Sequence, residues 1–387
     1  MVDHRHQSAL REATRLSKHI LITGGAGFIG SHLADKMLAH GYRVRVLDNL
    51  ALQVHGPEAK RPAYLDSDIE LIVGDVRDPE VVRLALKGID AVYHFAAAVG
   101  VGQSMYEIKK YTDTNNLGTA VLLEALMSRP IERLIVASSM SIYGEGLYRA
   151  ANGQLWSGTD RTRSQLEAGQ WEVCNLAGEV LTPMPTPETK QPSLASVYAL
   201  SKYDQERLCL MIGQAYGIPT VALRFFNVFG PRQALSNPYT GVLAIFASCL
   251  LNGNAPLIFE DGDQQRDFVS IHDVTQACRL ALEVSATAGQ VFNIGSGTAY
   301  TVREVAQRMA QVLDKADIQP EISRKYRVGD VRHCFADITL ARQVLGYEPR
   351  VTLAAGLVEL AGWLEGQVAF DRVAEARAEL VTRGLTV

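Results

Sequence analysis

The segment LITGGAGFIG, residues 21–30, decides how this sequence is interpreted. An apolar stretch precedes it and apolar residues at helical spacing follow it, so it predicts a strand, a glycine-rich turn and the start of a helix. Gly25, Gly27 and Gly30 fit the spacing G-x-G-x-x-G, and Gly24 adds the register G-x-x-G-x-x-G. Such a turn lets the backbone approach a pyrophosphate, and the start of the helix offers free N–H groups to it. The segment therefore predicts a dinucleotide-binding site.

The next apolar stretch, residues 43–47, ends in Asp48. A carboxylate at the end of a second strand can accept hydrogen bonds from both ribose hydroxyls of adenosine, and it repels a 2′-phosphate. We therefore expect NAD rather than NADP as the cofactor. The alternative is a glycine-rich turn of another α/β protein, with Asp48 as an ordinary turn residue. The strand and the helix that flank the turn argue against that alternative.

The composition narrows the class of protein. The 387 residues allow one large domain or two closely joined ones, and 47% hydrophobic residues suffice for a sizeable core. A net charge of −4 with mixed signs argues against a nucleic-acid partner. No apolar run is long enough to cross a bilayer, and residues 1–17 resemble a polar lead-in rather than a secretory signal. Five scattered cysteines without a C-x-x-C pair fit a reducing compartment, so we expect a cytoplasmic protein without a membrane partner.

Strand-like and helix-like segments alternate through the first half of the chain. The expected strands are 19–23, 43–47, 69–73, 91–95, 132–138 and 219–224, and the expected helices between them are 29–40, 79–87, 115–128 and 197–216. Continuously apolar strands that alternate with helices indicate a parallel sheet covered on both faces, the doubly wound α/β (Rossmann) fold. Ligands of this fold bind at the carboxyl ends of the strands.

A second, smaller mixed α/β domain is expected after Asn227, where glycine and proline interrupt the pattern and helices recur. Those helices are expected at 242–252, 272–285, 302–314 and 338–345. The predicted organisation is a lead-in (1–17), a dinucleotide-binding domain (18–227, with 269–297 returning to it), a substrate-binding domain (228–268 and 298–365) and a C-terminal tail (366–387). Residues 147–192 are polar, rich in proline and glycine and without periodicity, so we interpret them as an insertion.

Three residues have the spacing and the position of a catalytic group. Tyr198 and Lys202 are four residues apart, so they share one face of a helix. A nearby ammonium and a positively charged nicotinamide lower the pKa of a phenol, which can then act as base and acid near neutral pH. Ser139 ends an apolar strand and can pass a proton between a substrate oxygen and the tyrosine. The alternatives, a surface aromatic–lysine pair and a serine turn, are disfavoured because the dinucleotide segment lies upstream.

Together these features resemble the extended short-chain dehydrogenase/reductase superfamily, in its nucleotide-sugar epimerase/dehydratase branch. The matching motifs, which span about residues 19–350, are the glycine-rich turn, GDVRD (74–78), HFAA (94–97), Asn115, Ser138–Ser139, Tyr198 with Lys202, and RFFNVFGPR (224–232).

The resemblance implies roles for individual residues. The expected catalytic residues are Ser139, Tyr198 and Lys202. With the glycine-rich turn, the residues expected to hold NAD are Gly24, Gly27, Phe28, Ile29, Asp48, Asn49, Asp75, Val76, Phe95, Ala96, Ala97, Asn115, Tyr198 and Lys202. Those expected to hold a nucleotide-diphosphate sugar are Ser139, Asn227, Arg232, Thr240, Phe259, Arg266, Arg327 and Asp330. The resemblance also implies a homodimer through the helices near 115–128 and 197–216. We expect no metal, because Cys174 is the single cysteine of the insertion.

Arg266 and Arg327 are suited to a diphosphate because a guanidinium group can bind phosphate through two parallel hydrogen bonds. The alternative for both arginines is an ion pair with nearby Asp267 or Asp330 at the surface.

The residues after the catalytic serine distinguish between reactions. A dehydratase carries acidic residues there, whereas this chain has Met140 and Ser141, which cannot exchange a proton at the required pKa. A decarboxylase or C5 epimerase needs a further acid or base, and Glu145 lies past the site. The sequence therefore favours C4 epimerisation of a nucleotide sugar through a 4-keto intermediate. A 4-ketosugar reductase and a catalytically silent NAD-binding sensor are the alternatives, and the intact catalytic residues argue against the sensor.

Shorter segments narrow the resemblance further. Residues 98–105, 138–146 and 233–241, together with the insertion, resemble bacterial dTDP-L-rhamnose 4-epimerases, which interconvert dTDP-L-rhamnose and dTDP-6-deoxy-L-talose. Val99 stands where UDP-galactose 4-epimerases carry a lysine, which argues against a UDP-glucose/galactose-type 4-epimerase as the alternative.

Overall fold

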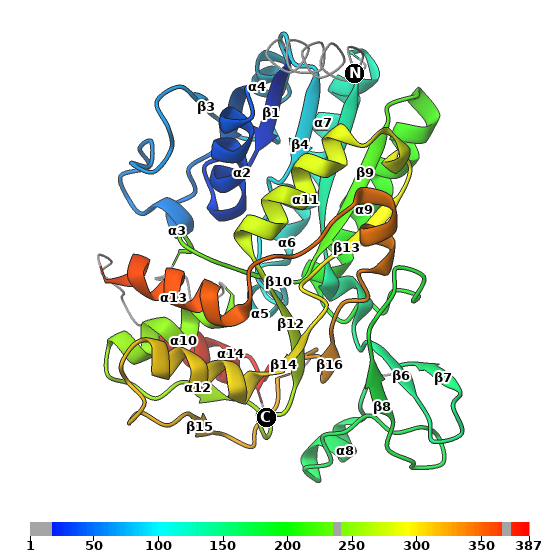
Figure 1. Cartoon of the computed structure of the whole chain (residues 1–387), viewed down its shortest axis with the longest axis vertical. Helices are drawn as coiled ribbons and strands as arrows, with labels where there is room; N and C mark the ends of the chain where they lie inside the picture. Colours follow the sequence, from blue (N-terminus) through cyan, green and yellow to red (C-terminus); the bar gives the residue numbers. More distant parts are fainter. Residues whose placement is uncertain are drawn as a thin grey trace, which may run out of the picture.

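The computed structural model describes residues 18–129, 131–158, 160–234, 241–327, 329–365 and 373–386. Its largest element is a seven-stranded parallel sheet with the order β13-β9-β5-β4-β1-β2-β3 (Figure 1). The strands are β1 (His19–Thr23), β2 (Arg43–Asp48), β3 (Glu70–Val73), β4 (Ala91–His94), β5 (Arg133–Ser139), β9 (Thr220–Phe225) and β13 (Val291–Ile294). The order reverses between β1 and β4, which is the switch point of a doubly wound sheet. The predicted α/β fold class is confirmed.

Helices cover both faces of this sheet (Figure 1). They are α2 (Phe28–Ala39), α4 (Pro79–Ala85), α7 (Gly118–Met127), α9 (Val197–Tyr216) and α11 (Ile271–Glu283). The single turns α3 (Leu52–His55), α5 (Val101–Ser104) and α6 (Ile108–Tyr111) lie in the connections that follow β2 and β4. Successive residues of β1 point to opposite faces. Ile20 and Ile22 pack into a core with α2 and α11, and Leu21 packs into another with α4, α7 and α9. Burial of both faces explains why the strand is continuously apolar.

One segment departs from the expected helix 115–128. Thr112–Leu117 are wound as a π-helix (η1), and α7 begins only at Gly118. A Cβ at Gly118 would lie 2.6 Å from Cγ1 of Val76, so only glycine allows this close approach. Turns of π-helix occur often at functional sites, and this one lies beside the carboxyl ends of the strands.

A second group of short strands lies beyond the carboxyl ends of the large sheet. A mixed four-stranded sheet contains β10 (Asn227–Phe229), β12 (Gln265–Ser270), β14 (Ala299–Thr301) and β16 (His333–Cys334), and β11 (Leu257–Ile258) pairs with β15 (Glu321–Ile322). The helices around them are α10 (Val242–Leu251), α12 (Val302–Val312), α13 (Leu353–Leu364) and α14 (Val373–Thr382) (Figure 1). Phe229, Phe268 and Leu357 are buried in their common core. The mixed strand directions agree with the smaller mixed α/β part that the sequence predicts.

The expected helix 338–345 is present from residue 339 and is wound as a π-helix, η4, over Ala341–Leu345. Ser285–Thr287 form a 3-10 turn, η3. The division into domains at particular residues stays a prediction, and its lead-in (1–17) lies outside the described residues.

The expected insertion is a small folded unit. It contains the antiparallel strands β6 (Leu147–Arg149), β7 (Leu155–Ser157) and β8 (Thr182–Met184), and the helix α8 (Arg163–Glu167). Tyr148, Val173 and Leu181 form a core of its own. In Figure 1 it projects at the lower right, beside β16. Its polar sequence without periodicity therefore belongs to three-residue strands rather than to an irregular loop.

Candidate active site

The glycine-rich turn connects the end of β1 to α2. Gly24 has φ +70°, and a Cβ there would lie 2.8 Å from the backbone N of Ala96. A Cβ at Gly30 would lie 2.4 Å from the carbonyl oxygen of Gly24, so both positions require glycine. Within the described residues no side chain caps α2 at Gly27, which leaves the N–H groups of its first turn for an anion. Phe28 and Ile29 lie in this first turn. These features fit the pyrophosphate of NAD.

Asp48 lies between this turn and the end of β2. Its carboxylate accepts hydrogen bonds from the backbone N–H of Ala26 (3.0 Å) and of Leu50 (2.9 Å). These bonds hold the carboxylate beside the turn, where the predicted contact with the adenosine ribose requires it.

The residues expected at the adenine end also come together. The side-chain amide of Asn49 donates to Asp75 (3.3 Å), and Arg77 forms an ion pair with Asp75 (2.7 Å). Hydrogen bonds from Arg77 outweigh burial and lower the pKa of Asp75 to about 2. Val76 is buried beneath Gly118. The group lies after β2 and β3, at the same edge of the sheet as the glycine-rich turn.

Asn115 of the π-helix joins the cofactor segment to the catalytic helix. It accepts a hydrogen bond from the N–H of Ala98 (2.7 Å) and donates to the Ala98 carbonyl (3.1 Å) and to Oγ of Ser201 on α9 (2.8 Å). The segment of Phe95, Ala96 and Ala97 precedes Ala98 directly after β4. Asn115 therefore has the contacts expected of a residue that holds the helix of Lys202.

The structure brings Ser139 and Tyr198 together. Ser139 is the last residue of β5 and Tyr198 lies in the first turn of α9, and the two side chains lie near enough for Ser139 to affect the pKa of Tyr198. Ser139 Oγ accepts hydrogen bonds from the backbone N–H (3.2 Å) and the hydroxyl (2.9 Å) of Ser141, in the 3-10 turn η2 (Met140–Tyr143). Its own proton can therefore point to Tyr198. Burial raises the pKa of Tyr198, and the Ser139 side chain opposes that rise.

Lys202 lies one turn further along α9. Its ammonium group is buried and donates to Oε1 of Gln205 (2.7 Å). Burial lowers the pKa of Lys202 to about 8, although Cys209 and Glu206 act against it. Gln205 in turn donates to Oγ1 of Thr119 (2.9 Å). Tyr198 and Lys202 are four residues apart on α9 and so lie on one face of the helix, where the ammonium group can favour a phenolate.

Several residues that support this group were not predicted. Ser104 accepts the backbone N–H of Tyr198 (3.0 Å) and so fixes the start of α9. His94 lies buried between Thr23 (2.9 Å) and Thr119 (2.8 Å), and burial lowers its pKa to about 3, so it is neutral. The only signal for His94 was its place in the motif HFAA. Ser104 has no signal because it is 94 residues from Tyr198 in the chain.

Four of the residues expected to hold substrate form a second group. The guanidinium group of Arg327 lies over the ring of Phe259 (4.7 Å) and forms an ion pair with Asp330 (2.8 Å). Arg266 also reaches Asp330 (3.4 Å) and donates to the carbonyl of Arg332 (2.9 Å). Burial acts to raise the pKa of Asp330, but Arg327 and Arg266 lower it to about 2. The ion pair with Asp330 that the sequence left as an alternative is therefore present. Arg327 keeps its Nη1 donors for a ligand, whereas both terminal nitrogens of Arg266 are already bonded within the described residues and only its Nε–H remains.

Asn227 and Arg232 have different surroundings. Asn227 begins β10, and its buried Oδ1 has no hydrogen-bond partner among the described residues, so one end of the amide is available to a ligand. Arg232 forms an ion pair with Asp35 of α2 (2.8 Å) and lies over the ring of Tyr64 (5.2 Å). Its contacts with Asp35 and Tyr64 place it on the side of the glycine-rich turn and not with Arg266 and Arg327. Thr240 lies outside the described residues.

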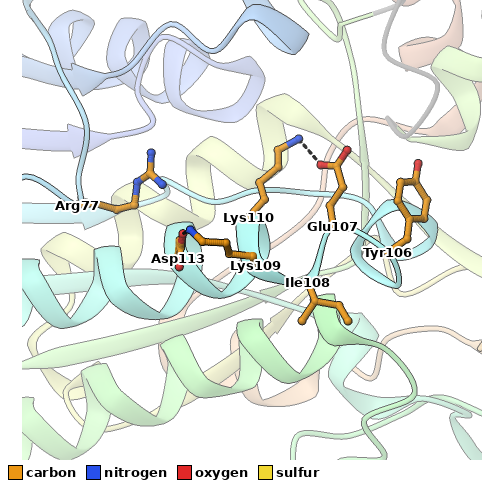
Figure 2. Close-up of a pocket in the computed structure, with 7 residues that line it drawn as sticks. All are labelled: Arg77, Tyr106, Glu107, Ile108, Lys109, Lys110 and Asp113. Carbon is orange, nitrogen blue, oxygen red and sulfur yellow. Dashed lines mark hydrogen bonds and ion pairs between the residues drawn. The ribbon is translucent and has the colours of Figure 1, made fainter.

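A pocket of about 480 Å³ lies on the outer side of α6 (Figure 2). It is lined by Arg77, Tyr106, Glu107, Ile108, Lys109, Lys110 and Asp113. Figure 2 shows Lys110 pointing to Glu107 (2.7 Å), and Lys109 pairs with Asp113. The proposed catalytic side chains do not line it, and its charged groups are already paired, Arg77 with Asp75 outside the pocket, so it is not the active site.

Two absences concern only the part of the chain that the structure describes. There, no group of three or more His, Cys, Asp or Glu side chains is arranged to hold a metal ion. Among the same residues, no helix has both the length and the apolar character that crossing a membrane requires.

Comparison with known proteins gives the family. Residues 20–165 and 174–295 match the model of the NAD dependent epimerase/dehydratase family. A dTDP-L-rhamnose 4-epimerase of Burkholderia thailandensis is 36% identical over 351 residues, which cover 90% of this chain and 95% of that protein. The chain therefore belongs to the NAD-dependent epimerase/dehydratase family, within the extended short-chain dehydrogenases/reductases.

Similar solved structures support the same family assignment. The UDP-glucose 4-epimerase of Thermotoga maritima, crystallised with UDP-glucose, matches with a TM-score of 0.73 and 31% identity over 90% of this chain and 98% of that one. The UDP-glucose 4-epimerase of Thermus thermophilus, crystallised with NAD, matches with a TM-score of 0.71 and 30% identity over 90% of this chain and all of that one. The cofactor of this family is NAD, and the glycine-rich turn and Asp48 described above suit it.

Proposed function

We propose that this protein is a nucleotide-sugar 4-epimerase that inverts C4 through a 4-keto intermediate. The observation that carries the proposal is that Ser139 lies beside Tyr198, that Lys202 is buried one turn further along the same helix, and that no acid directly follows the serine. Bound NAD supplies the oxidation and the subsequent reduction of the sugar at C4.

The side chains carry the proton. Tyr198 accepts the proton of the C4 hydroxyl as the ketone forms, and it returns a proton to the oxygen when the other configuration is made. Ser139 donates a hydrogen bond that holds this oxygen and the phenolate in reach of each other. Lys202 lowers the free energy of forming the Tyr198 phenolate, because its charge lies in a buried environment where electrostatic effects are strong.

Other reactions lack a side chain to perform them. Met140 has no titratable group, and the hydroxyl of Ser141 is bound to Ser139. The carboxylate of Glu145 is buried and accepts hydrogen bonds from the N–H of Arg332 (2.7 Å) and the hydroxyl of Tyr148 (2.7 Å). A carboxylate held in this way is a structural group and not a free acid for elimination at C6 or exchange at C5.

For the substrate, we propose dTDP-L-rhamnose and dTDP-6-deoxy-L-talose. The 36% identity to the Burkholderia dTDP-L-rhamnose 4-epimerase over 90% of the chain supports this choice, as do the segments 98–105, 138–146 and 233–241. Asn227, Phe259, Arg266, Arg327 and Asp330 are the residues proposed to hold the nucleoside diphosphate.

The test is incubation with dTDP-, UDP- and GDP-sugars, with the configuration at C4 read by NMR. We expect C4 inversion of dTDP-L-rhamnose without net consumption of added cofactor. Inversion of UDP-glucose instead would favour the second candidate, which the matches to UDP-glucose 4-epimerases support. If NAD(P)H is oxidised in proportion to product, the protein is a 4-ketosugar reductase and the proposal is wrong.

A homodimer is part of the proposal. Ile108, Leu117, Leu200 and Met211 are each about half exposed, at 53%, 50%, 53% and 49%. They belong to α6, the π-helix and α9, which include the helices near 115–128 and 197–216 expected to pair. Exposed apolar side chains on adjoining helices favour burial against a second copy. Light scattering after size exclusion tests this, and a monomer at micromolar concentration would contradict it.

A further inference from the structure

A cluster of charged side chains lies where the insertion meets the proposed substrate-binding group. Its members come from four distant segments and are Glu145, Arg161, Glu172, Glu260, Asp261, Arg332 and His333. Glu145, Arg161, Glu260 and Arg332 expose 4% or less of their side chains. Charges are rarely buried without a partner, because their desolvation is costly, so the geometry of such a cluster is well determined.

Arg332 is at the centre of this cluster. Its guanidinium group lies 3.0 Å from Glu260 and 2.6 Å from Asp261, and its Nε donates to Glu172 of the insertion (3.0 Å). His333 Nδ1 accepts the backbone N–H of Gln265 (3.1 Å), so Nε2 carries the hydrogen that binds Glu172 (2.9 Å). Glu172 therefore holds two consecutive residues of the segment that follows Asp330.

Arg161 of the insertion makes a second set of contacts with the segment 330–333 and its surroundings. Its guanidinium group lies 2.8 Å from Glu260 and donates to the backbone carbonyl of Asp330 (3.3 Å). On the other side, the carboxylate of Glu145 accepts the backbone N–H groups of Arg332 (2.7 Å) and His333 (3.2 Å). Residues 330–333 are thus held between the turn that follows Ser139 and the insertion.

This segment controls the two proposed diphosphate-binding arginines. Asp330 is the counter-ion of both Arg266 and Arg327, and the carbonyl groups of Val331 and Arg332 accept hydrogen bonds from Arg266. A displacement of residues 330–333 would therefore move both guanidinium groups. It would leave Ser139, Tyr198 and Lys202 in place, because none of the bonds described for those three involves this segment.

We propose that the insertion is a positioning element for substrate binding, in which Glu172 and Arg161 align Arg266 and Arg327 through residues 330–333. The proposal rests on the proposed function, because it takes these arginines to bind a nucleoside diphosphate. Glu172 and Arg161 are positioning residues, since they contact residues 330–333 and not the reacting atoms.

The test compares Glu172→Gln with Glu167→Gln in the full-length protein. Both substitutions lie in the insertion and remove one carboxylate charge, but Glu167 forms only an exposed pair with Arg163. Calorimetric titration with dTDP and with UDP measures nucleotide binding. Steady-state kinetics with the nucleotide sugar that the wild type converts give kcat and KM separately. For Glu172→Gln we expect Kd and KM to rise about tenfold with kcat within about twofold, because binding common to ground and transition states is lost. Glu167→Gln should match the wild type, and Glu172→Asp, which keeps the charge, should recover part of the loss.

The outcomes separate the two proposals. If the wild type binds neither dTDP nor UDP, the proposed function is wrong. If the wild type binds one of them and Glu172→Gln binds it equally well, or if only kcat falls, the positioning role is overturned. Should Glu172→Gln not fold, as judged by its thermal unfolding, Arg161→Lys decides in its place. It keeps a charge near Glu260 and removes the fork that reaches the Asp330 carbonyl, and unchanged nucleotide affinity in it overturns the proposal.

Discussion

The two halves of the site are built in different ways. On the cofactor side, positions are set by backbone: the glycine-rich turn, the ends of parallel strands and the start of α2. On the substrate side, positions are set by ion pairs between segments far apart in sequence, such as Arg266 with Asp330 and Arg332 with Glu172. Backbone geometry tolerates few substitutions, whereas ion pairs can be exchanged one at a time. We therefore expect abrupt losses from substitutions on the first side and graded losses on the second.

The largest effect is expected at the reaction centre that both halves serve. Tyr198→Phe should lower kcat by about 100-fold or more, because general acid–base catalysis at the C4 oxygen is lost while the ring is retained. The measurement is the initial rate of C4 inversion, with bound NAD quantified in the same sample. Tyr203→Phe, on the same helix, is the control. Near-normal turnover in Tyr198→Phe would remove Tyr198 from the mechanism.

The next effect tests the backbone side. Gly24→Ala should destabilise the protein by about 2 kcal/mol and reduce bound NAD, because the residue must keep a left-handed φ and its Cβ would meet the backbone at Ala96. Denaturant unfolding and release of bound nucleotide measure the two losses. Gly362→Ala on α13, where an added Cβ meets nothing within 4 Å, should cause neither. An unchanged NAD content in Gly24→Ala would contradict the placement of the pyrophosphate.

The third effect tests the ion-pair side. Arg327→Gln should raise KM for the nucleotide sugar about tenfold with little change in kcat, because one charge-assisted contact to the diphosphate is lost. Steady-state kinetics at saturating and limiting substrate measure both constants. Arg342→Gln, which breaks an exposed pair with Glu348, is the matched control. A fall in kcat alone would show that Arg327 acts on the reaction and not on binding.

The smallest expected effect is on stability, and it concerns one carboxylate from each half of the site, Asp75 and Asp330. The pKa values of Asp75 and Asp330 are lowered to about 2 in the folded protein. Both groups therefore add stability above about pH 4, and this contribution disappears as the pH falls towards 2. Partial exposure reduces it to about 1 kcal/mol each. Urea unfolding of Asp75→Asn and Asp330→Asn should show a deficit at pH 7 that shrinks near pH 3, and a deficit that stays constant with pH would contradict the lowered pKa values.

The same contrast explains what the sequence could predict. Six strands and the α/β class followed from apolar runs and from the glycine spacing, which are local signals. Ser139 and Tyr198 could be paired because strand ends of a doubly wound sheet meet at one edge. The contact of Ser104 with Tyr198 and the π-helix at Thr112–Leu117 depend on packing that leaves no local pattern.

Arg232 shows how the backbone decides where a motif residue lies. It lies eight residues after Arg224 in RFFNVFGPR, and the resemblance implied a substrate contact. In the structure the chain turns at Gly230, where φ is +155°, and Arg232 has φ +68° and reaches Asp35 of α2. The strands of the insertion were also not predictable, because three residues are too few to show an alternating pattern.

The contacts of Asn115 have a consequence for handling the protein. One amide joins the backbone at Ala98, beside the expected cofactor, to Ser201 on the helix of Tyr198 and Lys202. A ligand that binds only the folded state adds about 2.7 kcal/mol of stability at a hundred times its Kd. Bound NAD should therefore stabilise the folded protein as well as take part in the reaction. The melting temperature of a preparation would then report the fraction of protein that has kept its cofactor.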